Sequence, residues 1–327
     1  MSGSLSALLS SGRAPNRSPN RSANPAASPD LPWPSWLAQA QERHAQAPQA
    51  VAAELALQAA RLPADAVGAE LIALAEHVWL GHLADAAGLQ AFVDHLPAEL
   101  HHAEAITPVL QRLAWALACL AGQPATDRAA LPDLLRWRAL QNVVLAMAWQ
   151  GRCEAASALL LLDEGLAAGH GNAPAGRAFA ASANNIASDL CDGPRGDAAR
   201  DALMLTAAAL SRRAWGHAGT GLQVERAEYR LALCHAAVGL GAAAVHHARQ
   251  CLLLCQAEGG DPMELFFAYE ATVRAQLVIA NANASTNNGA VAAAAARQQM
   301  QALLPSISEA DGLRAWCAAT LQALPPA

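Results

Sequence analysis

The sequence contains no lysine, and all 21 of its basic residues are arginine. This excludes Schiff-base catalysis and a phosphate-binding P-loop lysine, because both need a side-chain amine. Aromatic residues make up only 4% of the chain, and β-branched residues are also scarce. Since strands depend on those residue types, a fold dominated by β-sheet is excluded as well.

Long apolar runs are missing too. The first residues break their apolar stretch with serines and no positive charge precedes it, so we expect no secretory leader. The longest charge-free stretches, residues 231–248 and 275–296, contain histidines or asparagines and fit no membrane span. The net charge of -6 argues against nucleic acid or an anionic membrane as a partner. We therefore expect a cytoplasmic protein whose seven cysteines are reduced thiols.

Alanine and leucine, both strong helix formers, dominate the composition. From residue 34 the pattern predicts successive helices, one of them over residues 65–80, joined by short loops with proline or glycine. Short loops make antiparallel neighbours, so we predict an all-α fold of stacked helical hairpins. The domains we expect are a disordered Ser/Pro/Asn/Arg-rich tail at 1–33, an N-terminal helical region that is a cap or degenerate repeats at 34–125, and helical repeats with a C-terminal capping helix at 126–327.

Two segments in the predicted repeats share a pattern. Each has a larger residue early in its first helix, glycine at the turn and alanine early in its second helix: Asn142, Gly151 and Ala156 in one, Leu231, Gly239 and Ala244 in the other. This pattern resembles the tetratricopeptide repeat, and the resemblance implies a right-handed α-solenoid over residues 130–304. The hairpins recur at roughly 40 to 47 residues against about 34 in that family, so a HEAT-like or unclassified α-solenoid stays open.

The resemblance implies a noncatalytic scaffold that binds a protein or peptide partner on its concave face, which the first helices of the hairpins line. The residues it places at or beside that face are Arg138, Asn142, Asn185, Arg226, Tyr229 and Arg230. Arginine presents a fork of donors to carboxylates and asparagine can hold an extended peptide backbone, which predicts an acidic segment or a C-terminal carboxylate as the ligand. The alternative is that the arginines among them only pair with Glu225 and Glu228 on a solvated surface.

Two other function classes stay open: a helical metal-binding or enzymatic bundle, and a repeat-containing regulator whose effector region is residues 34–125. The sharpest metal candidate is His247, Cys251 and Cys255, which share a helix face at spacings that suit zinc or copper, although such cysteines are commonly core residues. Glu99 and His102 form a single Glu-x-x-His pair, whereas di-iron bundles use two. Since no catalytic motif is present, we predict neither an enzyme nor a cofactor or metal.

Overall fold

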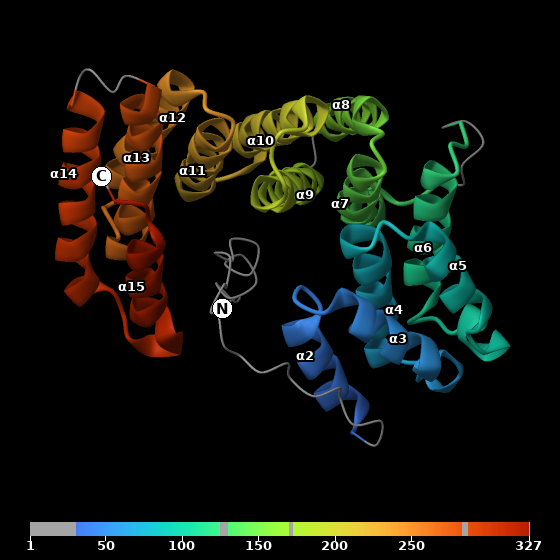
Figure 1. Ribbon diagram of the computed structural model, residues 1–327. Helices are drawn as coiled ribbons and strands as arrows, with labels where there is room; N and C mark the ends of the chain where they lie inside the picture. The colour runs from blue at the N-terminus through green and yellow to red at the C-terminus, as the bar shows by residue number, and fades with distance from the viewer. Residues whose placement is uncertain (1–30, 125–129, 170–172, 283–286, 327) are drawn as a thin grey trace. The chain divides into compact units, whose positions relative to one another are not determined.

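The computed structural model describes residues 31–124, 130–169, 173–282 and 287–326. These residues form two compact units, 31–163 and 164–326. Over the described ranges the chain forms fourteen α-helices and no strand, which confirms the all-α prediction (Figure 1). None of the helices in these ranges combines the length and apolar character that a membrane crossing needs.

The first unit begins with short helices and ends with longer ones. Its elements are α2 (Trp33–Arg43), α3 (Pro48–Gln58), η2 (Ala59–Arg61), α4 (Ala66–Glu76), η3 (His77–His82), α5 (Ala86–Asp94), η4 (Ala98–His102), α6 (Thr107–Leu120), α7 (Asp133–Trp149) and the first part of α8 (Cys153–Gly169). Local sequence explains where several of them begin. Asp65 caps α4 by accepting hydrogen bonds from two backbone N–H groups, and Asp85 caps α5 by accepting one from Gly88 N. Pro48 opens α3, where a missing N–H costs nothing.

The second unit consists of longer helices that pack in consecutive order. They are α9 (Ala173–Asp192), α10 (Ala198–Ala218), α11 (Gly221–Ala237), α12 (Gly241–Ala257), α13 (Pro262–Ala282), α14 (Asn288–Leu303), η5 (Leu304–Ser306), η6 (Ala310–Gly312) and α15 (Leu313–Ala323). The pairs α9–α10, α11–α12 and α13–α14 make the most extensive contacts. Buried alanines such as Ala244, Ala248 and Ala271 form one of the cores, because small side chains let helix backbones approach closely.

The division between the two units differs from the predicted domain boundary. It falls between Asp163 and Glu164, inside α8, whereas the sequence starts the repeats at residue 126. That predicted boundary lies at 125–129, outside the described residues, and so does nearly all of the predicted tail at 1–33. The predicted domain assignment stays a prediction.

Ion pairs between arginine and carboxylates join helices in both units. In the first unit Arg43 makes a two-pronged contact with Glu54, and Arg112 contacts the fully buried Glu76 at 2.6 Å. In the second unit Arg212 contacts the buried Glu228 at 2.6 Å. The buried carboxylates of Glu76 and Glu228 therefore each have a charged partner, which a buried ion needs.

Candidate metal centre

The site begins with an irregular helical turn. The sequence predicts one helix over residues 65–80, but α4 ends at Glu76 and a π-helix, η3, follows at His77–His82. Within it Leu83 N donates to Val78 O at 3.1 Å, so the hydrogen bond spans five residues instead of four. Residues five apart then approach the same side of the helix, which brings His77 and His82 together.

A third histidine joins these two from another helix. His44, at the C-terminal end of α2, has its ring centroid 5.2 Å from those of both His77 and His82, which are 4.7 Å apart. One ring nitrogen from each residue lies within 4.8 Å of the other two. We call these three residues the histidine cluster. Nowhere else in the described ranges do three or more potential metal ligands converge in this way.

Hydrogen bonds fix the proton position on two of the rings. His44 Nδ1 lies 2.6 Å from the backbone carbonyl oxygen of Gln41. Because a carbonyl oxygen can only accept, Nδ1 of His44 carries the hydrogen and donates it. The neutral ring therefore has its lone pair on Nε2, the nitrogen that a metal ligand of this tautomer uses.

A longer chain of hydrogen bonds fixes the proton position on the His77 ring. Asn142 Nδ2 donates to Glu76 Oε1 at 3.1 Å, and Arg112 Nε donates to the other oxygen of that carboxylate. Since the carboxylate accepts, the Asn142 amide nitrogen faces it and the amide oxygen faces His77. His77 Nδ1, at 2.9 Å, therefore donates to Asn142 Oδ1 and leaves Nε2 free. Metal-binding histidines are held by acceptors of this kind.

Packing around η3 holds the turn in place. Trp149 Nε1 donates to the carbonyl oxygen of Gly81 at 3.3 Å, and Gln150 Nε2 donates to that of Ala84 at 3.1 Å. A Cβ added at Gly81 would lie 3.0 Å from His77 Nδ1 and 3.3 Å from Asn142 Oδ1. Glycine at this position leaves the room that the imidazole–amide pair needs.

The surroundings of His82, the exposed member of the histidine cluster, keep its imidazole neutral. Desolvation, followed by the nearby His77 and His44, lowers the pKa of His82 to about 3, although part of the residue stays exposed. A neutral imidazole has the lone pair that binds a metal. Three such ligands with one position left open match the arrangement of catalytic zinc sites, while imidazole also suits copper and nickel.

The metal candidates from the sequence lie elsewhere and do not converge. Cys251 Sγ donates to Glu225 Oε1 at 2.8 Å, and His247 Nδ1 lies 2.7 Å from Glu228 Oε2. Both thiols of the candidate helix, including that of Cys255, are buried. Burial, helped by the neighbouring carboxylate of residue 264, raises the pKa of Glu225 to about 8, so its carboxyl is mostly protonated at neutral pH. The arrangement is a buried polar core, in keeping with the alternative reading of these cysteines.

The Glu-x-x-His pair of the sequence lies on the surface, outside the histidine cluster. Glu99 and His102 lie in the short η4 and are both exposed. Neither belongs to the histidine cluster.

The residues predicted to bind a partner have varied surroundings. Arg138 is exposed on α7, Asn185 is half-buried on α9, and Asn142 is 7% exposed and takes part in the contacts that position His77. On α11, Arg226 pairs with Glu264 and Tyr229 donates to Glu270 at 2.8 Å.

The remaining predicted partner residue, Arg230, is 7% exposed. The alternative prediction is that the arginines pair with Glu225 and Glu228 on a solvated surface. The solvated surface is wrong, because both glutamates are buried. Partner binding itself stays a prediction.

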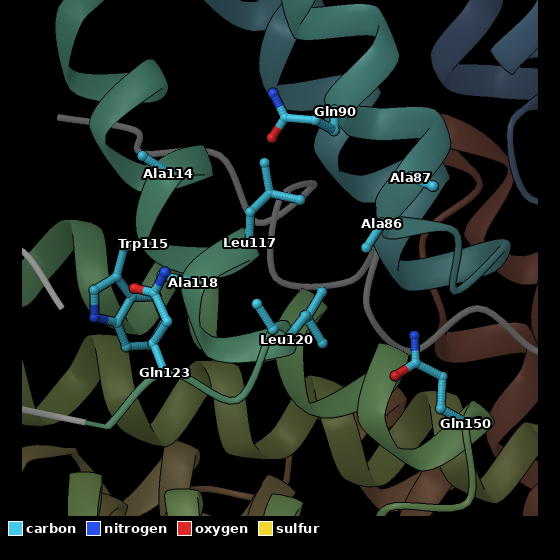
Figure 2. Close-up of a pocket in the computed structure, with 11 residues that line it drawn as sticks. Ala86, Ala87, Gln90, Ala114, Trp115, Leu117, Ala118, Leu120, Gln123 and Gln150 are labelled. Carbon is cyan, nitrogen blue, oxygen red and sulfur yellow. The ribbon is translucent and has the colours of Figure 1, made fainter. Parts of the chain in front are cut away.

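A pocket of about 640 Å³ lies in the first unit, between α5, α6 and the end of α7 (Figure 2). Its lining is alanine, leucine and Trp115, with three amide side chains: Gln90, Gln123 and Gln150. Because no titratable side chain among the described residues lines it, the described part of the pocket supplies no acid, base or metal ligand. The histidine cluster is therefore the chemically stronger site.

The histidine cluster has no signature in the sequence, because its three members share no recognisable spacing. Comparison of the chain with protein-family models, with curated proteins and with solved structures finds no match. The geometry of the site is thus the basis for a function.

Proposed function

We propose that the protein binds one divalent transition-metal ion through His44, His77 and His82, with zinc as the best-matched metal. The observation that supports this is the convergence of three imidazole nitrogens within 4.8 Å of one another. A tetrahedral zinc ion with bonds of about 2.0–2.1 Å needs ligand nitrogens about 3.4 Å apart. Inward movement of the rings by up to about 1.5 Å would satisfy this distance.

The ligand set selects a class of metal. Imidazole binds zinc, copper and nickel well, whereas magnesium and calcium prefer oxygen ligands. No thiol lies in the histidine cluster, which argues against copper(I) and iron–sulfur centres. Copper(II) binds nitrogen sites more tightly than zinc in general, so both ions belong in the experiment.

The surroundings of the ligands favour the proposal as well. Backbone carbonyl and amide oxygens accept the Nδ1 hydrogens of His44 and His77, which orients Nε2 of both rings. Three protein ligands leave the fourth position to water or to a small ligand. A bound ion would also tie the end of α2 to η3.

The test titrates chelator-treated protein with zinc and, in a parallel series, with copper(II) by calorimetry, and uses cobalt(II) absorption as a report of tetrahedral coordination. We expect one ion per chain, and a loss of affinity of at least tenfold in His77→Ala and in His82→Ala. His102→Ala, which removes an exposed histidine outside the histidine cluster, is the matched control. His82 is exposed, so its replacement keeps the test valid if His77→Ala fails to fold. Unchanged stoichiometry and affinity in folded His82→Ala would overturn the proposal.

We also propose that the second unit is an α-solenoid, similar to tetratricopeptide repeats, that binds an acidic protein or peptide segment. The observation that favours it is the consecutive packing of α9 with α10, α11 with α12, and α13 with α14. A fluorescent acidic peptide with a free carboxylate, followed by anisotropy, is the probe. We expect Arg226→Ala to weaken binding severalfold and to reduce its salt dependence. The control is Arg249→Ala, an exposed arginine on the second helix of the same pair. Equal binding by folded Arg226→Ala would refute this assignment.

A further inference from the structure

Two cysteines from different helices meet in the second unit. Cys191 lies near the end of α9 and Cys234 lies within α11, and these two helices pack against each other. Cys234 is fully buried, and its thiol donates to the carbonyl oxygen of Ala187 at 3.8 Å. Ala187 lies one turn before Cys191 on the same helix, so both thiols lie at the contact between α9 and α11. Cys191 is half-buried, while the other six cysteines are all buried. One member of the pair is therefore accessible from solvent and the other lies behind it.

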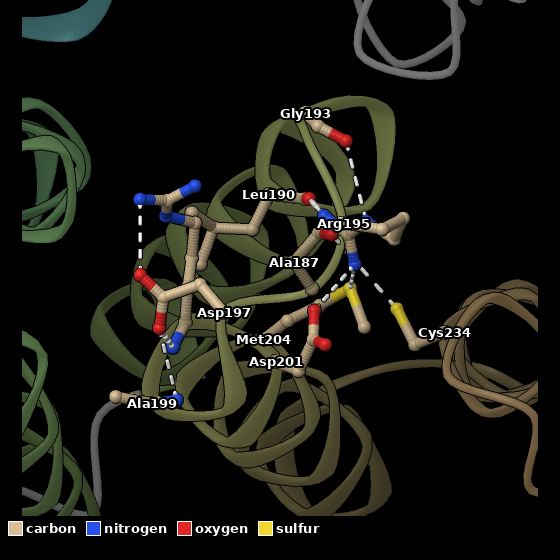
Figure 3. A network of polar contacts seen from close by, with 10 residues as sticks. Ala187, Leu190, Gly193, Arg195, Asp197, Ala199, Asp201, Met204 and Cys234 are labelled. Atoms are coloured by element: carbon tan, nitrogen blue, oxygen red, sulfur yellow. Dashed lines mark hydrogen bonds and ion pairs between the residues drawn. The ribbon is translucent and has the colours of Figure 1, made fainter.

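Positive charge gathers around this pair. Figure 3 shows Arg195 held between the carbonyl oxygens of Leu190 and Gly193 and the side chains of Asp201 and Met204. A second arginine, Arg230, is 7% exposed, and its Nε has no hydrogen-bond partner among the described residues. A buried guanidinium next to a thiol favours the thiolate.

The two thiols consequently differ in acidity. The neighbouring Cys234 thiol, followed by Arg230 and Arg195, lowers the pKa of Cys191 to about 7, in spite of burial and the nearby Asp192. The neighbouring Cys191 and burial raise the pKa of Cys234 well above its usual value. A thiolate thus faces a protonated thiol at neutral pH, which is the arrangement of redox-sensing cysteine pairs.

We propose that Cys191 is a modification site for hydroperoxides and that Cys234 resolves the product as a disulfide. The Cys191 thiolate attacks one oxygen of hydrogen peroxide, the O–O bond breaks, and the leaving hydroxide takes up the proton that the Cys191 thiol released to solvent when it ionised, which forms water. Cys191 is then a sulfenic acid. The Cys234 sulfur attacks the Cys191 sulfur, the S–O bond breaks, and the hydroxyl leaves as water with the proton of Cys234. Two thiols lose two electrons and one peroxide gains them.

The surrounding structure makes the reaction selective. Burial raises the pKa of the thiols of Cys251, Cys255 and Cys317, which keeps them protonated and poorly nucleophilic. The disulfide would join α9 to α11, which pack against each other without being neighbours in sequence. Peroxide would therefore lock two consecutive helical pairs together.

The test treats the reduced full-length protein with one equivalent of hydrogen peroxide in the presence of a metal chelator. Peptide mapping should show a Cys191–Cys234 disulfide, a mass loss of two hydrogens and at least a tenfold loss of maleimide labelling at Cys191, all reversed by dithiothreitol. In Cys234→Ser, dimedone should trap a sulfenic acid on Cys191. Cys255→Ser, a buried thiol outside the pair, is the control and should form the disulfide normally.

Two results would overturn the proposal. One is a Cys191 that proceeds to sulfinic acid in the wild-type protein without linking to Cys234. The other is peroxide modification of a different cysteine before Cys191. Because mapping of the wild-type chain gives either result, the test does not depend on whether a variant folds.

Discussion

Replacement of Asn142 by leucine tests the metal centre and its support together. The Asn142 side chain is 7% exposed and joins the fully buried Glu76 to His77. Leucine has a similar size and fills the space, but it can neither donate to the carboxylate nor accept from the imidazole. Arg112 still contacts Glu76 Oε2, so the carboxylate stays paired at one oxygen and loses its donor at the other.

Asn142→Leu should lower both the thermal stability of the protein and its affinity for zinc. A buried acceptor without a donor costs about 1–3 kcal/mol, so we expect the melting temperature to fall by roughly 5–10 °C. Loss of an acceptor that orients a ligating histidine typically weakens metal binding by about 10- to 100-fold, or about 1.4–2.7 kcal/mol. Circular dichroism with chelator present measures the first effect, and calorimetric zinc titration measures the second.

A control on the same helix separates these effects from general damage. Arg138→Ala alters an exposed side chain of α7 outside the contacts around His77, and both quantities should stay at wild-type values. If Asn142→Leu loses stability but binds zinc as tightly as the wild type, the argument that Asn142 orients His77 is refuted.

Three further predictions concern packing and titration. Gly81→Ala should weaken zinc binding at least fivefold in the same titration, because its Cβ would crowd the imidazole and amide beneath it, whereas Gly165→Ala meets no neighbour and should change nothing. Ala156→Leu and Ala244→Leu should each cost about 1–3 kcal/mol in denaturant unfolding, since both alanines are fully buried; an unchanged midpoint would contradict that packing. Glu225 has a folded-state pKa of about 8, above the value of about 4.5 expected when unfolded, so its contribution to stability is complete below pH 4.5 and is lost as pH rises through 8. The melting temperature of Glu225→Gln should therefore fall less between pH 5 and 8 than that of the wild type. Parallel pH dependence of the two melting temperatures would count against a buried protonated carboxyl.

The helical framework could be predicted because its signals are local. Asp65 accepts from the first backbone N–H groups of α4, and Asp261 does the same for α13, as their positions in the sequence indicate. Propensity and capping act within a few residues, so no knowledge of distant contacts is needed. The two alanines of the repeat-like pattern, Ala156 and Ala244, are both fully buried.

The histidine cluster could not be predicted, because it depends on distant contacts. On an ideal α-helix, residues five apart such as His77 and His82 point about 140° away from each other. Only the π-helical turn, held by bonds from Trp149 and Gln150, brings these rings together. His44 comes from a separate helix and carries no signal of its own.

Asn142 shows the limit of aligning repeats. Its place early in a predicted first helix put it at a partner-binding face, yet its amide contacts residues that lie 65 and 66 positions earlier in the chain. Spacing along one helix cannot reveal a partner so distant in sequence. The buried carboxylate that fixes the amide is equally invisible to a periodic pattern.

The ion pairs of both units have a consequence for alkaline conditions. A lysine ammonium group would lose its charge above about pH 10, whereas guanidinium stays charged throughout the accessible range. Contacts such as Arg112–Glu76 and Arg212–Glu228 therefore persist in base, and alkaline unfolding would have to begin at other groups. The buried phenol of Tyr229, whose pKa is raised well above its usual value by burial and by Glu270, is also protected there. The sequence contains no lysine, so reagents that acylate side-chain amines do not remove the positive charge of these ion pairs.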